Sequence, residues 1–197
     1  MKKIIFKLIS KEERLNSRSN KYPFLMNKNM KKSVPFIDEV EEFNEVMGKS
    51  YQNRTTPTIN PKDAQFVIDF ITEELDELKE AVEKKDIVEI FDALLDITYV
   101  GLGNGALVFG LKEQMIAGYA EVQASNMSKI CQTLEEAEET VKVRSEQQKE
   151  PCHYLSDGKG KYVVYRSSDN KVMKSINYFR PNLKQFFTQD EIDSCKK

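Results

Sequence analysis

The chain of 197 residues contains no tryptophan, only one histidine and only three cysteines. Zinc sites in proteins depend on histidine and cysteine ligands, so this sequence offers almost none of the residues that such a site needs. The cysteines, Cys131, Cys152 and Cys195, are odd in number and form no Cys-x-x-Cys pair. They fit a reducing compartment and argue against a disulfide framework. We therefore expect a cytoplasmic protein whose chemistry depends on other side chains.

Long hydrophobic runs and an excess of one charge are also missing. The longest apolar candidate, residues 87–111, is broken by acidic residues and by four glycines, whereas a membrane-spanning helix needs about 20 consecutive apolar residues. Thirty Lys and Arg residues stand against 32 Asp and Glu residues, for a formal net charge of -2. That balance gives no general attraction to nucleic acid or to an acidic membrane surface. We expect a soluble protein with neither of these partners.

Three regions differ in composition. Residues 1–32 carry ten Lys and Arg against two Glu with little hydrophobic periodicity, and we expect a basic, disordered extension there. Residues 33–150 show the periodicity of several amphipathic helices and predict an all-α domain. Residues 151–197 contain a turn signal followed by the β-rich run KYVVYR and a basic tail. The predicted fold is an all-α bundle of four to five helices with a small C-terminal β-hairpin and extended segment.

The most informative segment is Ile87–Val100, IVEIFDALLDITYV, which is apolar apart from Glu89, Asp92, Asp96 and one threonine. In a helix these three acids fall within a wedge of about 60°, and apolar side chains cover the rest of the circumference. A helix that is apolar on nearly every side is expected inside a protein, where an unpaired carboxylate is costly. Because no Lys or Arg occurs in residues 87–111, a bound metal ion is the simplest source of the compensating charge.

A second acidic group lies in the preceding helix, which we expect over residues 62–84 and which contains the string EELDE. Glu74 falls in the middle of the apolar stripe of this helix, between Phe70 and Leu78, and Glu77 lies at its edge. An acid inside an apolar stripe is a stronger sign of function than an acid on a polar face, because its burial is costly.

The helix expected after Thr133 provides an internal control, because its EEAEE string also satisfies the pattern EExxE. Few apolar residues accompany this second copy, and no apolar acidic helix follows it. We expect its glutamates to form a solvated face.

Two antiparallel helices would place Glu74 and Glu77 opposite Glu89 and Asp92. Such a set of carboxylate oxygens suits Mg²⁺ or Mn²⁺. Di-iron cages in helix bundles require Glu-x-x-His pairs, which a chain whose only histidine is His153 cannot supply. The alternative is that the acids pair with Lys or Arg of other helices or line a polar dimer interface.

The spacing of these acids resembles a known signature. EELDE followed by EIFD is similar to the EExxE…ExxD motif of the all-α NTP pyrophosphatases, a superfamily that includes MazG-type enzymes, phosphoribosyl-ATP pyrophosphohydrolases and dimeric dUTPases. The segment DALLDITYVGLGNGALVFGL resembles the third helix and following turn of that superfamily. EVQASNMSK and KVMKSINYFRPNL resemble segments of its phosphoribosyl-ATP pyrophosphohydrolase-like branch. The resemblance extends over residues 33–183.

The resemblance implies a metal site and a catalytic pair. Glu74, Glu77, Glu89 and Asp92 would coordinate Mg²⁺, with Mn²⁺ as the alternative ion. Glu73 and Glu74 would be catalytic, and Glu73 would orient the attacking water or hold a second ion.

The resemblance also implies substrate contacts. Asp96 would point towards the nucleotide. Asn126 and Lys129 would reach the phosphates, and Lys171 and Lys174 would add to phosphate binding from the tail.

The function implied is a Mg²⁺-dependent nucleotide pyrophosphohydrolase that cleaves a (d)NTP or phosphoribosyl-ATP to a monophosphate and pyrophosphate. The resemblance and the apolar helix expected over residues 87–100 both lead us to expect a homodimer or a larger homo-oligomer. The alternative is a catalytically idle helical dimer that binds nucleotide or a partner protein. The long C-terminal extension and KYVVYR favour a general nucleotide hydrolase over a biosynthetic enzyme, but the nucleotide itself stays open.

Overall fold

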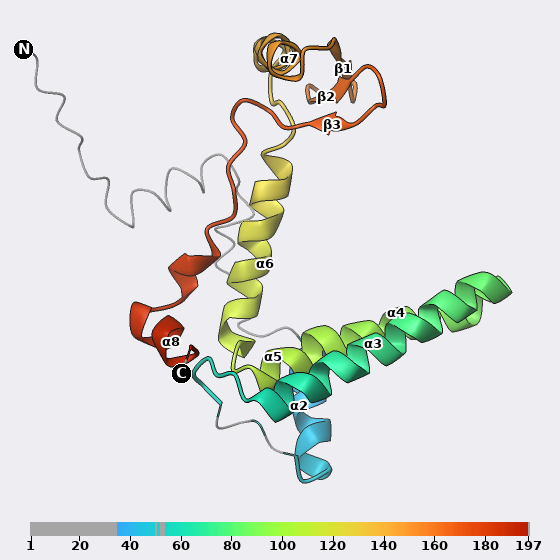
Figure 1. The fold of residues 1–197 in the computed structure, drawn as a ribbon, viewed down its shortest axis with the longest axis vertical. Coiled ribbons are helices and arrows are strands. Elements are labelled where there is room, and N and C mark those ends of the chain that lie inside the picture. The colour runs from blue at the N-terminus through green and yellow to red at the C-terminus, as the bar shows by residue number, and fades with distance from the viewer. Residues whose placement is uncertain (1–34, 50, 52–53, 197) are drawn as a thin grey trace, which may run out of the picture. The chain divides into compact units, whose positions relative to one another are not determined.

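The computed structural model describes residues 35–49, 51 and 54–196, so the basic extension expected at residues 1–32 lies outside the described residues. The chain is mainly helical, with a small sheet towards its C-terminal end (Figure 1), which confirms the predicted helical class. Within the described ranges no helix combines the length and the apolar character needed to cross a bilayer. The chain divides into two compact units: the described part of residues 29–118 together with the residues from 184 onward, and residues 119–183. We call them the hairpin unit and the sheet unit.

The hairpin unit begins with four helices and a π-helical segment. These are α2 (Pro35–Val46), α3 (Pro61–Lys84), α4 (Ile87–Ile97), the π-helix η2 (Thr98–Asn104) and α5 (Gly105–Val108). Helix α6 (Lys112–Met127) starts in this unit and continues into the sheet unit. After residue 183 the hairpin unit contains most of the 3₁₀ turn η3 (Leu183–Phe186) and the short helix α8 (Gln189–Ser194).

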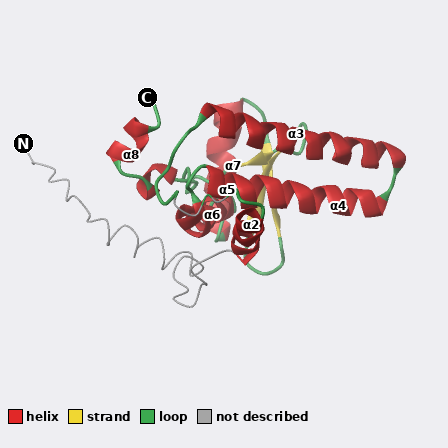
Figure 2. Cartoon of the chain, turned by 90° about the horizontal axis from the view of Figure 1, so that it is seen from below, coloured by secondary structure: helices red, strands yellow, loops and turns green. Residues whose placement is uncertain are grey.

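Local capping explains where the two long helices begin. Asn60 lies before α3, and its side chain accepts hydrogen bonds from the backbone N–H groups of the first turn. Asp86 does the same for α4. Between them Lys85 adopts a left-handed conformation with φ 56°, which ends α3 and reverses the chain. The result is an antiparallel α3–α4 hairpin, seen side by side in Figures 1 and 2.

The core of the hairpin unit lies where α2 packs against η2 and α5. Ile37 and Val40 of α2 are buried against Ala106 and Leu107. Gly103 makes this approach close, because a Cβ atom there would lie 2.6 Å from a methyl carbon of Val40. The glycine-rich stretch after α4 therefore allows a helix to pack closely against its neighbour.

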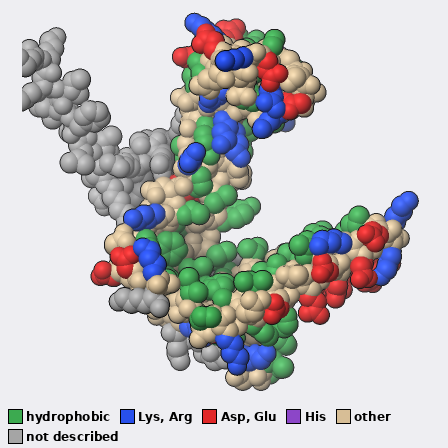
Figure 3. Space-filling view, in the orientation of Figure 1, with side chains coloured by type: hydrophobic (Ala, Val, Ile, Leu, Met, Phe, Trp, Pro, Cys, Tyr) green, Lys and Arg blue, Asp and Glu red, His purple; other side chains and the backbone are tan. Residues whose placement is uncertain are grey.

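The expectation that the helix over residues 87–100 is buried is wrong for the single chain. Ala93 is the residue of α4 that is fully buried. Phe91 is 62% exposed, and Leu94 and Leu95 are about half exposed, so hydrophobic side chains appear along the hairpin surface in Figure 3. The reason is that α3 can cover only one side of a helix whose apolar residues extend nearly all round it.

The sheet unit packs α7 (Leu134–Gln148) against a three-stranded antiparallel sheet of order β1-β2-β3. The strands are β1 (Cys152–Ser156), β2 (Tyr162–Arg166) and β3 (Val172–Met173). The sequence predicted only a hairpin, because the two-residue strand β3 is too short to show an alternating pattern. Cys131, Ala137, Cys152 and Val164 form the buried core between helix and sheet.

The segment after β3 returns along the C-terminal half of α6 and is fixed to it by hydrogen bonds. Ser125 Oγ donates to the Phe179 carbonyl at 2.9 Å, and the Phe179 N–H donates to Ser128 Oγ at 3.2 Å. Further along, the Asn182 N–H donates to the Glu121 carboxylate at 2.8 Å. Side chains of α6 thus hold the tail in place within the sheet unit.

Candidate active site

The α3–α4 hairpin brings five carboxylates into one electrostatic neighbourhood. The centre is Glu74 on α3, whose pKa is raised above its ordinary value. Burial is the largest cause, and the next causes are the charges of four other acids, which are Asp96, Glu77, Glu73 and Asp92. Acids from both helices therefore act on the same carboxyl group, as antiparallel packing of α3 and α4 requires.

Glu74 is distinguished from the other acids by its unsatisfied oxygen. Its Oε2 atom is buried and has no hydrogen-bond partner within the described part of the chain. Buried polar atoms are usually hydrogen-bonded, because leaving one unpaired costs free energy. An ionised Glu74 therefore needs a cation, and its hard oxygen suits a divalent ion such as Mg²⁺.

The other acids of the group are more accessible to solvent. Glu73, Glu77, Glu89 and Asp92 are exposed, and Asp96 is half-buried. Among residues 35–49, 51 and 54–196, no group of three His, Cys, Asp or Glu side chains is already arranged around a single metal position. Like charges repel one another, so these exposed acids are not expected to converge on one point without a cation. The set of metal ligands therefore stays a prediction.

Glu89 occupies the outer end of the acidic strip of α4. Its charge contributes to the raised pKa of Lys84, for which the hydrogen bond to Glu80 is the largest cause. Of the predicted metal ligands, the structure thus places Glu74, Glu77 and Asp92 within one electrostatic group and Glu89 about one helical turn from Asp92.

Three of the predicted phosphate-binding residues lie close together in the sheet unit, around Tyr178. Lys129 Nζ donates to Asn126 Oδ1 at 2.8 Å, and Lys174 Nζ lies 4.3 Å from the centre of the Tyr178 ring. The pKa of Tyr178 is lowered, first by a hydrogen bond with Ser125 and then by Lys174 and Lys129. This is a cationic surface with hydrogen-bond donors, as phosphate binding needs.

Lys171 lies apart from that group, beside β3. With Lys174 and Arg144 it lines a surface cavity of about 220 Å³. The guanidinium of Arg144 donates to the backbone carbonyls of Lys174 and Ser175. The sequence did not single out Tyr178 or Arg144, because each acquires its role through contacts with residues distant in the chain.

The control helix behaves as expected at three of its four glutamates. Glu135, Glu138 and Glu139 are exposed on α7. Glu136 is not part of a solvated face, because its carboxylate accepts hydrogen bonds from the Gln132 N–H and the Ser175 hydroxyl. The sequence could not show this, since Ser175 comes from the tail after β3.

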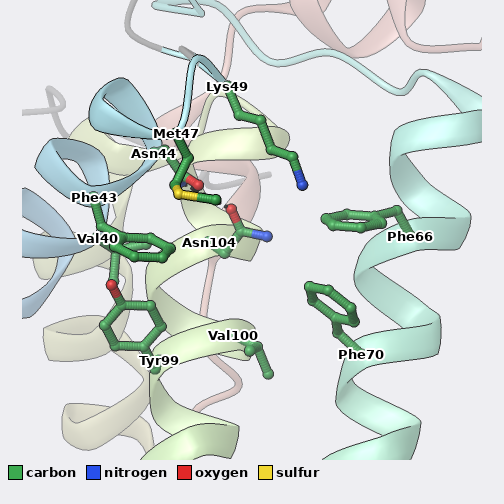
Figure 4. Close-up of a pocket in the computed structure, with 10 residues that line it drawn as sticks. All are labelled: Val40, Phe43, Asn44, Met47, Lys49, Phe66, Phe70, Tyr99, Val100 and Asn104. Atoms are coloured by element: carbon green, nitrogen blue, oxygen red, sulfur yellow. Dashed lines mark hydrogen bonds between the residues drawn. The ribbon is translucent and has the colours of Figure 1, made fainter.

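A cavity of about 180 Å³ opens in the hairpin unit between α2, α3 and η2 (Figure 4). Its walls carry the rings of Phe66, Phe70 and Tyr99, and its polar groups include the side chains of Asn44 and Asn104. No pattern in the sequence pointed to this cavity. Segments of π-helix are rare and frequently occur at functional sites. No residue pattern predicted that Thr98–Asn104 would form a π-helix.

Comparison with known proteins matches a family model to the part of the chain that contains the acidic hairpin. Residues 40–126 match the family model described as phosphoribosyl-ATP pyrophosphohydrolase. The matched range contains all six acids of the predicted site and Asn126, whereas Lys129, Lys171 and Lys174 lie beyond it. A search of curated proteins found no match.

Proposed function

Because residues 40–126 match the phosphoribosyl-ATP pyrophosphohydrolase family, as the sequence resemblance predicted, we propose that this protein is a nucleotide pyrophosphohydrolase dependent on a divalent metal ion. It cleaves the α–β phosphoanhydride of a nucleoside triphosphate or of phosphoribosyl-ATP and releases pyrophosphate. The observation that carries the proposal is Glu74, a half-buried carboxylate with one buried, unpartnered oxygen among four further acids. A purely structural acid would have a partner for that oxygen.

The donor set fits Mg²⁺ or Mn²⁺. Glu74, Glu77, Glu89 and Asp92 offer only carboxylate oxygens, which hard divalent ions prefer. The ion supplies charge neutralisation for the phosphates and lowers the pKa of a water molecule.

The chain's own residues divide the remaining work. Glu73 is exposed beside Glu74 and accepts the proton of the attacking water. The water oxygen forms a bond to the α-phosphorus, the bond from that phosphorus to the bridging oxygen breaks, and pyrophosphate leaves with the electron pair. Asp96 orients the nucleotide. The resemblance assigns phosphate contacts to four residues of the sheet unit, Asn126, Lys129, Lys171 and Lys174.

The exposed apolar face of the hairpin fits a homodimer. Phe91, Leu94 and Leu95 on α4, with Ile68 and Leu75 on α3, are all about half exposed. A hairpin with apolar residues on its outer face buries them by packing against a second hairpin, which completes a four-helix bundle. Light scattering during size-exclusion chromatography tests this: a mass near twice 22.8 kDa supports the dimer, and a mass near 22.8 kDa contradicts it.

The activity is tested with a substrate panel. Purified protein is incubated with each NTP, each dNTP and phosphoribosyl-ATP in Mg²⁺, and pyrophosphate is measured. The Asp92→Asn variant is compared with Glu83→Gln, a matched change at an exposed glutamate near the end of α3. We expect Asp92→Asn to lose activity and Glu83→Gln to keep it.

Two results would contradict the proposal. One is the absence of pyrophosphate with every nucleotide; the other is full activity in Asp92→Asn. Nucleotide binding that needs no metal, together with full tolerance of Glu89→Gln, would instead favour an idle nucleotide-binding dimer.

A further inference from the structure

The cavity between α2, α3 and η2 contains a fixed hydrogen-bond donor. Asn44 Nδ2 donates to Asn104 Oδ1 at 3.1 Å, and both side chains are more than nine-tenths buried. This bond orients the Asn104 amide so that its nitrogen points into the cavity, as Figure 4 shows. Within the described residues Asn104 Nδ2 has no acceptor of its own. An amide held in this way suits a ligand that brings an acceptor atom.

The opposite wall of the cavity is aromatic. The rings of Phe66 and Phe70 on α3 lie with their centres 4.3 Å apart, and on the other side Phe43 and Tyr99 meet edge to face. In Figure 4 the two phenylalanine rings of α3 face the Asn104 amide across the open space. Aromatic walls of this kind bind flat heteroaromatic rings by stacking, and each stacked base contributes about 1–3 kcal/mol in nucleic-acid complexes.

The volume of the cavity indicates the size of the aromatic ring that a ligand could place in it. An apolar cavity of about 150 Å³ holds one benzene molecule, and this cavity has about 180 Å³. One six-membered ring with polar substituents therefore fills it. A fused two-ring purine would extend beyond this volume into the open side of the cavity.

A second donor lies at the rim. Lys49 is exposed, and its Nζ lies 4.9 Å from the centre of the Phe66 ring. In Figure 4 this amine points towards the same space as the Asn104 amide. Two donors across one ring suit a ligand with carbonyl or ring-nitrogen acceptors, and pyrimidine bases carry such acceptors on their edges.

On α3 and on α4–η2, residues that line the cavity lie about one helical turn from the acidic cluster. Phe70 and Glu74 are one turn apart on α3, and Val100 and Asp96 are four residues apart at the end of α4 and the start of η2. One helical turn is about 5.4 Å, so a base in the cavity directs its sugar and phosphates towards the carboxylates.

We propose that this cavity binds the pyrimidine base of the nucleotide substrate, with Asn104 and Lys49 as the donors that determine specificity. The assignment of the ring to a substrate rests on the proposed function. The fit of a pyrimidine ring in the cavity does not depend on catalysis and is measured separately.

Binding is tested with nucleoside monophosphates, which contain no phosphoanhydride to cleave. Titration calorimetry compares UMP and CMP with AMP and GMP on the full-length wild-type protein. Methyl NMR follows the cavity residue Met47, with Met173 of the sheet unit as the internal reference. We expect the pyrimidine monophosphates to bind about tenfold more tightly than the purine ones and to shift the methyl signal of Met47 and not that of Met173.

Two substitutions act on the donors. Asn104→Asp keeps the acceptor for Asn44 but removes the NH₂ group, and Lys49→Met removes the rim amine without burying a new polar group. Each lowers pyrimidine affinity by roughly tenfold, a cost typical of one lost hydrogen bond to a buried site. Gln65→Glu, an amide-to-acid change on the exposed face of α3, leaves affinity unchanged. Thermal unfolding checks the fold, and Lys49→Met carries the test if Asn104→Asp does not fold.

The outcomes separate this proposal from the proposed function. Pyrimidine binding that is lost in the donor variants supports the base site even if no nucleotide is hydrolysed, a result that would overturn only the activity. Hydrolysis that prefers purine nucleotides, or unchanged pyrimidine binding in both donor variants, overturns the base site and leaves the activity standing.

Discussion

Glu74 on α3 and Glu136 on α7 occupy the same place in two EExxE strings and are both half-buried, yet their carboxylates differ in their partners. Glu74 keeps a buried oxygen without a partner in the described chain, and its pKa is raised, first by burial and then by neighbouring acids. Glu136 accepts hydrogen bonds from the Gln132 N–H and the Ser175 hydroxyl. The comparison teaches that a motif string does not identify a site; the state of the carboxylate oxygens does.

The same contrast separates two acids of the sheet unit from the cluster around Glu74. In the sheet unit, Asp169 binds the Arg166 guanidinium at 2.6 Å and Asp157 accepts two backbone N–H bonds. Their pKa values are lowered, as expected for carboxylates whose charged form is stabilised. In the hairpin unit, the acids around Glu74 repel one another. Paired carboxylates stabilise a fold, whereas a repelling cluster is kept at a cost that binding a cation removes.

The largest expected effect is that of Glu74→Gln. The change keeps the shape of the side chain and removes its charge, so activity falls by roughly 10²–10³-fold, as for other losses of electrostatic stabilisation at an active site. The melting temperature rises at the same time, because the buried charge and its repulsion are gone. Pyrophosphate release and thermal unfolding are measured on the same preparation. A variant that melts at a lower temperature would show that Glu74 is structurally satisfied and would remove the contrast with Glu136.

The matched change Glu136→Gln has the opposite profile. It weakens the hydrogen bonds to Gln132 and Ser175, so we expect a loss of about 1–3 kcal/mol in the free energy of unfolding. Activity changes far less than in Glu74→Gln. Urea denaturation monitored by circular dichroism measures the stability. If Glu136→Gln abolishes activity without loss of stability, the two EExxE strings share a function and the comparison fails.

The smallest effect concerns Asp169, whose pKa is lowered from 3.8 to about 2, chiefly by its hydrogen bonds with Arg166. A carboxylate with a depressed pKa adds stability above its unfolded pKa, and that stability is lost as the pH falls from about 4 to about 2. Asp169→Asn removes this contribution, so its melting temperature should depend less on pH in that window. Parallel melting curves of both proteins check the slope; identical slopes would contradict the pairing.

Local signals in the sequence predicted much of the helical framework. The helix predicted over residues 62–84 is α3 (Pro61–Lys84), and the apolar segment 87–100 forms α4 and the start of η2. The place of Glu74 between Phe70 and Leu78 correctly indicated a carboxylate withdrawn from solvent. Each of these features depends on residues within one or two turns of chain.

Features that depend on distant residues were not predictable. The exposure of Phe91 depends on which elements cover α4, and one hydrogen bond of Glu136 depends on Ser175, 39 residues later. The cavity needs Asn44 and Asn104 to meet across 60 residues of sequence. Periodicity reports which face of a helix is apolar, but it does not report what covers that face.

The π-helix η2 controls the rotational phase of the chain that follows it. Its N–H groups donate to carbonyls five residues back instead of four, so each hydrogen-bonded turn contains one residue more than a turn of α-helix. One residue of α-helix corresponds to about 100° of rotation. The angle about the helix axis between the acids of α4 and the amide of Asn104 therefore depends on two things. One is the number of residues between them, and the other is the π-helical geometry of Thr98–Asn104. Deleting a single residue there would turn η2 into an ordinary helix and swing Asn104 away from the aromatic wall, with every acid of the cluster still in its place.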